Sequence, residues 1–565
     1  MERKSPLPHL LLLALFLALC CFPACGSASG GIAFWVTPAD GSGPSDAAAV
    51  RSYQDESDSY YLFLPAGWEA SRLRFWYKQE GSAAIAGVDA RNGELTSAFK
   101  PGKTVRVRVG KTTASVHVMQ SKGVASVFLT TASGSLSKIH TSKSNTEEGA
   151  IAVFDGTQSG AVLTDTLAEI RCRGNSSFTL PAKKSYQFKL TSKAEVLGMS
   201  RGRTWILTAG FRDDSHIRNK LVYDLARYVG LENAIESRFV DVYINGAYRG
   251  LYTLCEKIQI NDDRLTIGDL EDATQDANEE PLSSYASTGP KKATAGKGLR
   301  SQIPNDPKDI TGGYLLCIQR ITHYGERPAS YVTKTETYFE VKEPHYLTES
   351  EYTYISQLLQ SVEDALSARD GTDPRTGLHY TELIDLDSFA LKYLLEEVSE
   401  NYDAAHNSQY FYKPDDSIGT KLYAGPAWDY DTTFGSYASK KTPYRDALDP
   451  AKLWVSRRFA HESCWYALLY GHGAFQTRMK ELWKERFLPA LDILQGKQTD
   501  PTGTLLSVDA YAAQIEASAA MDVIRWPITG EWSAAADTGS TFKANITYLK
   551  TFIDKRRTYL TKLWK

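Results

Sequence analysis

The segment around Asn245-Gly246 constrains the fold more than any other part of this sequence. Two apolar segments, 239–244 and 248–254, flank this dipeptide. Asn-Gly readily adopts the positive φ angles that a two-residue β-hairpin requires. Just before the hairpin, apolar residues recur at helical spacing between the cap candidates at 213–215 and the stop residue Gly230: Ile217, Leu221, Leu225 and Val229. An amphipathic helix followed closely by a hairpin predicts an α+β fold in which the helix packs on a sheet.

Residues 31–122 have the pattern of a small all-β domain. Short segments alternate apolar and polar residues, and Gly, Ser and Pro residues separate them. The pattern predicts an Ig-like β-sandwich that serves as a spacer or adhesion module. The predicted strands are 60–64, 73–77, 104–109 and 114–119, and the strands predicted at 124–129 and 150–154 belong to the next domain.

Residues 1–25 have the organisation of an export signal. Two basic residues precede an apolar run over 10–22 that is too short to span a membrane, and small residues follow. Cys25 and the Gly/Ser-rich stretch behind it resemble a bacterial lipid-acceptor site, and ordinary signal cleavage nearby is the alternative. We expect an exported protein, extracellular or at the cell surface, with no transmembrane helix in the mature chain and with Cys25 as the candidate lipid anchor.

Charge and cysteine content argue against two other classes of protein. The 64 Lys and Arg residues and 67 Asp and Glu residues give a net charge of -3, so we expect no nucleic-acid partner. The cysteines after the leader contain no C-x-x-C pair, which argues against a zinc ribbon or redox motif. Their spacing leaves disulfides and buried free thiols as open alternatives; they are Cys172, Cys255, Cys317 and Cys464.

The second half of the chain is predicted to be mainly helical after one unusual segment. Residues 267–312 are small, polar and charged without a period, which predicts a disordered insertion or mobile loop. Thr348 and Glu351 form a capping box, and a second helix is predicted from the cap candidate Asp387. The C-terminal extension 491–565 is expected to be helical, with the cationic run at 555–557 as a solvated helix face.

Three polar segments are candidates for chemistry. The turn at 171–177, with lysines at 183–189 behind it, has the composition of a phosphate-binding turn or of a plain surface β-turn. In the segment 400–408, Asp403 and Asn407 lie four residues apart, a spacing typical of a catalytic Asp and a magnesium-binding Asn, and an Asx-capped turn is the alternative. In 425–435, two carboxylates two residues apart are surrounded by aromatic residues, which favours a metal cation over a plain turn. Those carboxylates are Asp429 and Asp431.

Two further patterns carry little weight. The match to G-x-S-x-G at 198–202 is followed by a strand-like segment, whereas a nucleophile elbow requires a helix there. His406 has no second His or Cys at metal-ligand spacing, so we do not expect a zinc site.

Taken in order, these motifs resemble the CotH family, the spore-coat-type atypical kinases. The resemblance covers residues 124–490. The motifs that carry it are Arg173-Gly174-Asn175-Ser176-Ser177, Lys183-Lys184-x-Tyr186, Trp205-Ile206-Leu207, Ile217-Arg218-Asn219-Lys220-Leu221, the 243–252 hairpin with Glu256-Lys257, Gly312-Gly313-Tyr314, Lys342-Glu343-Pro344, Asn401-x-Asp403 and Trp428-Asp429-x-Asp431.

The resemblance implies a divergent two-lobed protein-kinase-like domain. Such a domain transfers the γ-phosphoryl group of ATP, with Mg²⁺ or Mn²⁺, to Ser or Thr of a coat or cell-surface protein. Carried over by motif position, Asp403 is the catalytic Asp, Asn407 and Asp429 are metal ligands, and Asp431 is a supporting carboxylate. The residues expected to contact the nucleotide are Gly174, Asn175, Ser176, Ser177, Lys184, Lys189 and Glu256.

The sequence departs from the family pattern at one strand. Cys317 and Gln319 stand where the family commonly has acidic residues, which affects nucleotide or substrate contacts rather than the metal-binding acids. The competing hypothesis is a non-catalytic kinase-like protein of the cell surface or spore coat, in which the β-sandwich serves adhesion or assembly.

Overall fold

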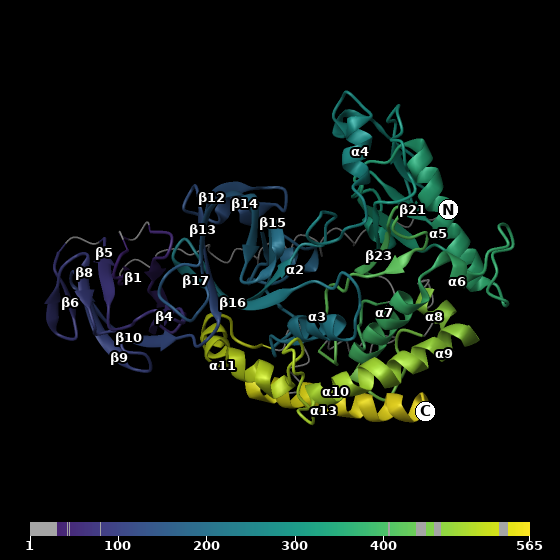
Figure 1. Cartoon of the computed structure of the whole chain (residues 1–565). Helices are drawn as coiled ribbons and strands as arrows, with labels where there is room; N and C mark the ends of the chain where they lie inside the picture. Colours follow the sequence, from purple (N-terminus) through teal and green to yellow (C-terminus); the bar gives the residue numbers. More distant parts are fainter. Residues whose placement is uncertain are drawn as a thin grey trace, which may run out of the picture.

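The computed structural model describes residues 31–565 apart from 42, 44–45, 79–80, 405–406, 437–447, 457–464 and 530–540. The predicted leader with Cys25, and the residues His406 and Cys464, lie outside the described residues. Figure 1 shows a β-rich unit at one end, a barrel in the middle, and a further sheet with most of the helices at the other end. The architecture is a mixed α+β fold, as the sequence predicts. The finer assignment as a two-lobed kinase-like domain stays a prediction.

The N-terminal unit consists of two sheets that share an apolar core. One sheet has the order β2-β1-β5-β8 and the other the order β3-β4-β10-β9-β6-β7. The alternation of apolar and polar residues along a strand determines which of its faces is buried in the core. In β9 the valines at 105, 107 and 109 are buried, and the polar residues between them are exposed or partly exposed. The described part of 31–122 holds strands and no helix, consistent with the predicted all-β region, and its assignment as an Ig-like domain stays a prediction. The strands are β1 (Phe34–Pro38), β2 (Val50–Arg51), β3 (Tyr53–Gln54), β4 (Tyr60–Leu64), β5 (Leu73–Tyr77), β6 (Ala83–Ile85), β7 (Val88–Ala90), β8 (Glu94–Thr96), β9 (Thr104–Val109) and β10 (Thr112–Gln120).

A closed barrel follows, in the order β11-β12-β13-β14-β15-β17-β16. Parallel pairing of the first strand with β16 closes it, so no edge is left open. Its elements are β11 (Ala125–Thr131), α1 (Ser137–Thr141), β12 (Glu147–Phe154), β13 (Leu163–Cys172), α2 (Ser176–Thr179), β14 (Tyr186–Val196), β15 (Met199–Thr208), α3 (Arg218–Tyr228), β16 (Ser237–Ile244) and β17 (Ala247–Glu256).

The predicted hairpin and helix are confirmed inside this barrel region. Asn245 and Gly246 have φ angles of 52° and 78°, as the turn requires. Helix α3 ends before Gly230, which has φ 84°. The cap candidates at 213–215 were wrong in detail, because Ile217 is the N-cap; Asp213 instead accepts a hydrogen bond from the backbone N–H of Arg218 at 2.8 Å.

The prediction of a disordered insertion at 267–312 is wrong. The segment forms α4 (Leu270–Asp276), the 3₁₀ turn η1 (Leu282–Ser284), β18 (Ser287–Thr288) and β19 (Lys297–Ser301). Leu270 and Leu282 are buried, and Thr274 donates a hydrogen bond to Glu351 at 2.5 Å. Long-range contacts therefore order a segment that has too few apolar residues to show a period.

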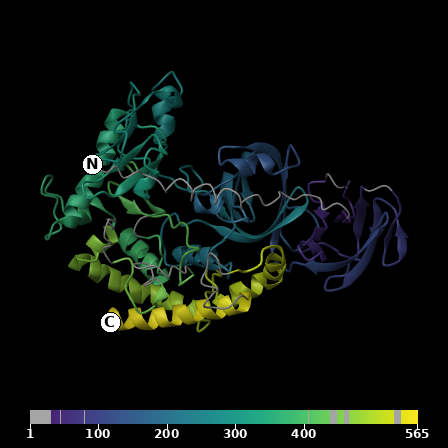
Figure 2. The same cartoon turned by 180° about the vertical axis from the view of Figure 1, so that it is seen from behind.

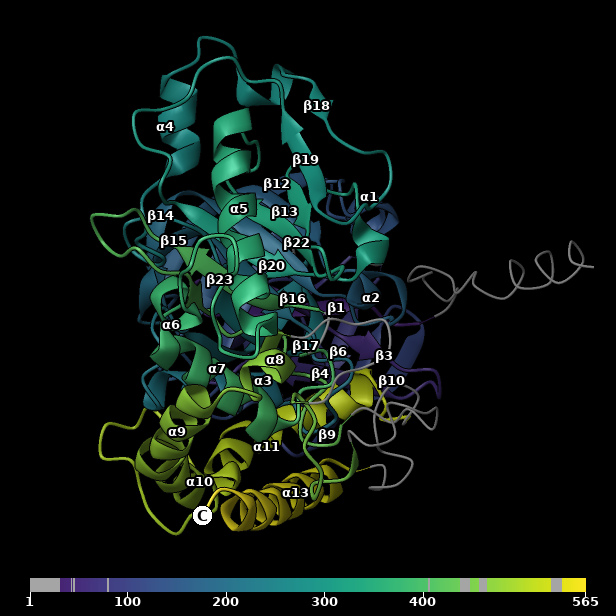
Figure 3. The same cartoon turned by 90° about the vertical axis from the view of Figure 1, so that its right-hand side faces the viewer.

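This segment contributes strands to a sheet that follows the barrel in the chain and is called the second sheet from here on. Its strand order is β18-β19-β21-β22-β20-β23-β24. In the view of Figure 3, α4 and β18 lie at the top of the molecule. The remaining strands and the turn beside them are β20 (Tyr314–Ile318), η2 (Ile321–His323), β21 (Ser330–Val332), β22 (Tyr338–Glu343), β23 (Gln409–Lys413) and β24 (Tyr423–Ala424).

Several helices after β22 begin at side-chain caps, among them α5, α7, α11 and α13. The predicted capping box of Thr348 and Glu351 is confirmed. The next long helix begins at Asp385, which caps it through the N–H of Ser388, rather than at the expected Asp387. The helical elements are α5 (Glu349–Ser367), α6 (Tyr380–Leu383), α7 (Leu386–Ser399), α8 (Trp465–Leu469), α9 (Gly473–Leu482), the π-helical turn η4 (Trp483–Phe487), α10 (Leu488–Leu494), α11 (Val508–Arg525) and α13 (Phe542–Leu563).

The C-terminal helices belong to the same core as the second sheet. Ile515 of α11 and Leu560 of α13 are buried in one apolar cluster with Val398 and Phe411. Seen from behind, α13 runs along the helical part and α11 reaches the barrel (Figure 2). The expectation of a solvated face at 555–557 is wrong for Arg556, which is only 1% exposed.

Two further observations concern the described residues alone. Cys172, Cys255 and Cys317 are buried free thiols. In the part of the chain that the structure describes, we find no helix with both the length and the apolar character needed to cross a membrane.

Candidate active site

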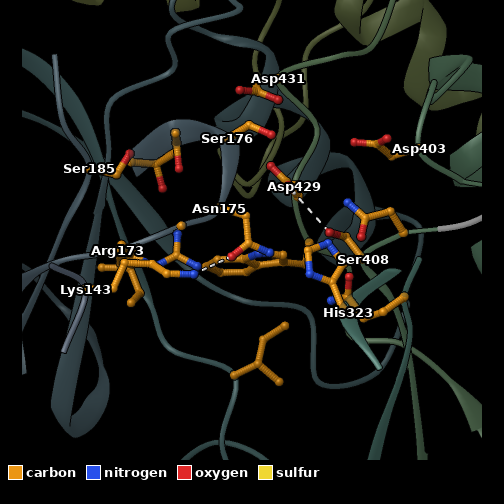
Figure 4. A pocket seen from close by; sticks show the side chains of 18 of the residues that line it. Lys143, Arg173, Asn175, Ser176, Ser185, His323, Asp403, Ser408, Asp429 and Asp431 are labelled. Carbon is orange, nitrogen blue, oxygen red and sulfur yellow. Dashed lines mark hydrogen bonds between the residues drawn. The ribbon is translucent and has the colours of Figure 1, made fainter. Parts of the chain in front are cut away.

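A cavity of about 850 Å³ lies between the barrel and the second sheet. The barrel side contributes the turn that joins β13 to α2. The other side contributes the end of β22 and the two loops that contain Asp403 and Asp429. Figure 4 shows Asp403, Asp429 and Asp431 gathered with Arg173 and Asn175 around this space. Segments separated by more than 200 residues in the sequence therefore meet in one site.

The turn after β13 depends on a glycine. Gly174 has φ 93°, and a Cβ at this position would lie 1.8 Å from the Ser177 Oγ. Asn175 follows in an exposed position, where its Oδ1 accepts a hydrogen bond from Lys143 Nζ at 2.7 Å. The turn thus presents small and amide side chains at the rim of the cavity.

The loop with Asp403 begins where α7 ends. Glu400 closes the helix in the left-handed region at φ 50°. Asn401 holds the following turn, because its Oδ1 accepts from the Asp403 N–H at 3.1 Å and its Nδ2 donates to Glu396 at 2.7 Å. The Asp403 carbonyl accepts from the Asn407 N–H at 2.9 Å, and Arg320 Nη2 lies 3.6 Å from the Asp403 carboxylate.

The loop with Asp429 is anchored on α3. The Tyr430 N–H donates to Asn219 Oδ1 at 2.7 Å, and the Asp429 N–H donates to the Tyr223 hydroxyl at 3.4 Å. Asp429 itself has φ 68°, which is uncommon for a residue with a side chain and is often found at functional sites. Its Oδ2 accepts from Ser408 Oγ at 3.3 Å, so the two acidic loops contact each other.

Burial and mutual repulsion act on the acids of these loops. Burial raises the pKa of Asp431 well above its usual range, and the charge of Asp429 adds to this shift while Arg212 opposes it. Burial also raises the pKa of Asp429, the charge of Asp403 adds to it, and Arg173 opposes it. A cation bound between these carboxylates would relieve both costs.

The donor set fits magnesium or manganese, although the described residues contain no group of three or more His, Cys, Asp or Glu side chains arranged to hold a metal. Mg²⁺ is commonly bound by one or two carboxylates, with water and substrate phosphates completing the shell. Asp429 and Asp431 supply carboxylates, and Asn407 supplies an amide oxygen at the same cavity. All these ligands are oxygen donors, which suits a hard cation.

Cations line the rest of the cavity. They include Arg171, Arg173, Arg212, Lys257, Arg327 and Lys342. Burial lowers the pKa of Lys257 while the charge of Glu343 opposes this shift, and burial raises the pKa of Glu343 to about 7. A cavity with carboxylates at one place and several cations elsewhere suits a polyanion bound together with a metal ion.

The model of the CotH kinase protein family matches residues 170–560, most of the chain. The chain belongs to the CotH family. The match extends beyond residue 490, where the sequence analysis placed the end of the family domain, and includes α11 and most of α13.

Comparisons with curated proteins and with solved structures give no further information about the fold or function of this CotH-family chain. No curated protein matches it. Among solved structures, a putative glycoside hydrolase from Bacteroides thetaiotaomicron is similar over 58% of this chain and 89% of its own, with 12% identity and a TM-score of 0.12. That score is too low to say anything about fold.

Most of the residues predicted from the CotH motifs line the cavity. These are Gly174, Asn175, Ser176, Ser177, Asp403, Asn407, Asp429 and Asp431. Their roles stay predictions.

Three predicted nucleotide contacts do not line the cavity. Lys184 donates to the Phe178 carbonyl at 2.5 Å. Lys189 lies on β14, partly buried, outside the cavity lining. Glu256 accepts from the Glu236 N–H at 2.8 Å.

Sequence reasoning missed several residues that line the cavity in this CotH-family chain. Lys257, which directly follows the last residue of β17, lines it, whereas Glu256 at the end of the strand does not. Arg173 and Glu343 were quoted within motifs but given no role. Gln319 also lines the cavity, whereas Cys317 is buried on β20, and burial raises the pKa of its thiol to about 12.

Proposed function

We propose that this chain is an exported CotH-type protein kinase that transfers the γ-phosphoryl group of ATP to Ser or Thr of a coat or cell-surface protein. One observation carries the proposal. The acidic loops that contain Asp403 and Asp429 contact each other through Ser408 and Asp429, at a cavity whose opposite side is the glycine turn 173–177. This combination suits phosphoryl transfer, which needs positioning and charge neutralisation and no protein nucleophile.

In this proposal Asp403 is the catalytic Asp. Its carboxylate orients the acceptor hydroxyl and accepts its proton as the oxygen attacks the γ-phosphorus. The bond from the γ-phosphorus to the β–γ bridging oxygen breaks, and ADP leaves with that oxygen. Asn407, Asp429 and Asp431 hold Mg²⁺ or Mn²⁺, which when bound neutralises charge on the phosphates. The backbone strain at Asp429 supports a role that requires this carboxylate at a defined place.

The phosphates are assigned to the barrel side of the cavity. Backbone N–H groups of the 174–177 turn are donors for phosphate oxygens, and Gly174 makes a close approach of the backbone feasible. Lys257 is proposed as the phosphate-binding lysine in place of Lys184 and Lys189, because it lines the cavity and its pKa is lowered by burial.

The proposed location rests on the sequence. The leader at 1–25 supports export, Cys25 is the candidate lipid anchor, and the spore coat or cell surface is the proposed place of action. The second candidate function is a non-catalytic kinase-like surface protein. The all-β unit at the N-terminus favours it, because such a unit has no part in phosphoryl transfer.

Transfer of label from [γ-³²P]ATP tests the proposal. The protein is incubated with Mg²⁺ or Mn²⁺ and a Ser-rich test protein, alone and as Asp403→Ala, Asp429→Ala and Asp509→Ala variants. Asp509 is an exposed carboxylate on α11 and serves as the matched control. We expect label in the wild type and the control, and its loss in the other two variants.

The variants also separate binding from chemistry. Asp429→Ala is expected to abolish metal-dependent nucleotide binding, whereas Asp403→Ala retains binding and loses transfer. Absence of both label and nucleotide-induced thermal stabilisation in the wild type would reject the kinase and favour the surface protein.

A further inference from the structure

We propose that Arg173 binds the terminal phosphate of the nucleotide and that Trp428 provides the surface that positions its guanidinium. The inference rests on the proposed kinase function and adds a residue that selects a nucleoside triphosphate over a diphosphate. Neither residue has a role in the predictions from the sequence, although both stand inside the quoted motifs.

The backbone of Arg173 is held at the rim of the barrel. It directly follows β13, and its N–H donates to the Ser185 carbonyl of the adjacent segment at 3.0 Å. The next residue, Gly174, begins the turn proposed for the phosphates. The side chain therefore starts from a fixed point and extends across the cavity to the other side.

On that other side the guanidinium meets an aromatic ring. The Arg173 Cζ lies 5.2 Å from the centroid of the Trp428 ring, within the range of a cation–π contact. Trp428 is in turn stacked on Tyr223 of α3, with centroids 6.2 Å apart and planes inclined by 24°. The indole is 9% exposed, so a buried and supported surface holds the cation in place.

The stacked position leaves the donors of Arg173 available. Among the residues that the structure describes, no carboxylate lies within ion-pair distance of its guanidinium and none accepts a hydrogen bond from it. Arg218 provides a contrast, because its guanidinium is committed to Asp213 and to the Thr433 carbonyl. An arginine held by stacking and still able to donate several N–H bonds is suited to a phosphate group.

The neighbourhood points to the terminal phosphate. Trp428 directly precedes Asp429, and the positive charge of Arg173 acts on the Asp429 carboxylate. A metal held by Asp429 would neutralise charge on the β- and γ-phosphates, as in other phosphoryl-transfer enzymes. Arg173 is therefore assigned to the outermost phosphate rather than to the base or ribose.

Binding of ATP, ADP and adenosine measured by calorimetry with Mg²⁺ tests the inference. The variants are Arg173→Met, Arg173→Lys and Trp428→Leu, with Arg106→Met as the control. Arg106 is exposed on β9 and does not line the cavity, so its loss removes an equal charge away from the site. Charge-assisted hydrogen bonds to a phosphate are strong enough that Arg173→Met is expected to weaken ATP binding about 10- to 100-fold.

The pattern over the ligands distinguishes the outcomes. The inference predicts that Arg173→Met and Trp428→Leu lower the ratio of ATP to ADP affinity and that Arg173→Lys lowers it less. Arg106→Met should leave this ratio unchanged, and the affinity for adenosine should be unchanged in all the variants. A purely structural role would lower the melting temperature and weaken ATP and ADP equally, and would overturn the inference. A wild type that binds neither nucleotide would instead reject the kinase proposal itself.

Discussion

Arg556 of α13 and Glu397 of α7 form a buried ion pair, with 2.5 Å between the arginine Nη2 and the glutamate Oε1. The same guanidinium donates to the Glu397 carbonyl at 2.6 Å. The carboxylate also accepts from the backbone N–H of Trp454 at 2.6 Å. This cluster ties the last helix of the chain to the end of α7, and the loop with Asp403 starts directly after that end.

Replacing Arg556 by Met is expected to lower the free energy of unfolding by about 3–5 kcal/mol, because it leaves the Glu397 carboxylate buried without its cation. Urea denaturation measures the change. Lys555→Met is the matched control, since Lys555 is exposed on the same helix and is expected to change stability by less than about 0.5 kcal/mol. Equal stability of the two variants would show that the ion pair makes no net contribution.

The adjacent lysines 183 and 184 are expected to behave differently. Lys183 Nζ lies 2.7 Å from both Asp522 of α11 and the Leu251 carbonyl, and its side chain is 8% exposed. Lys183→Met therefore leaves a buried carboxylate without its cation and should cost about 3 kcal/mol. Lys184 is partly exposed and bonds one carbonyl, so Lys184→Met should cost less than about 1 kcal/mol. Melting curves of both variants measure the difference, and a larger loss for Lys184 would contradict it.

Gly174→Ala is expected to distort the turn at the cavity. An alanine there has an unfavourable positive φ, which costs about 1–2 kcal/mol, and its Cβ also meets the Ser177 Oγ. We expect nucleotide affinity to fall about tenfold, and the strain to lower the melting temperature by only a few degrees. Adding Ser177→Ala removes the steric conflict but not the φ strain, so it should restore binding only in part. Full affinity in the single variant would remove the turn from the nucleotide site.

Glu343 should make stability depend on pH. Burial raises its pKa to about 7 from the ordinary 4.5, so the folded protein binds this proton more tightly than the unfolded chain. The stabilisation from that proton is complete below pH 4.5 and is lost as the pH rises through 7. Glu343→Gln removes this loss, and at pH 8 it should be more stable than the wild type by about 3 kcal/mol. At pH 4 the two should be equal.

Denaturant unfolding at several pH values checks the Glu343 prediction. The Gln side chain retains an acceptor for the Ile260 N–H, which donates to Glu343 at 2.6 Å. A difference between variant and wild type that stays constant from pH 4 to 8 would contradict the assignment of the titration to this residue.

Local elements were predictable because neighbouring residues specify them. The Asn245-Gly246 hairpin and the capping box of Thr348 and Glu351 depend on turn and cap chemistry within a few residues. The cap at Asp385 was missed by only two residues, since several acidic residues near that helix start are suitable caps. The acidic pair Asp429 and Asp431 was recognised because two carboxylates among aromatic side chains are costly to bury without a partner.

The sequence by itself determined the α+β class, the strand and helix signals and the family, because each depends on residue types at short or ordered spacing. Tertiary structure alone decided that 267–312 is ordered, that Arg556 is buried, and that Lys257 rather than Glu256 lines the cavity. These outcomes depend on which face of an element a distant segment covers. A shift of one residue along a strand turns its side chains to the opposite face, and the local sequence pattern does not specify which distant segment will cover that face.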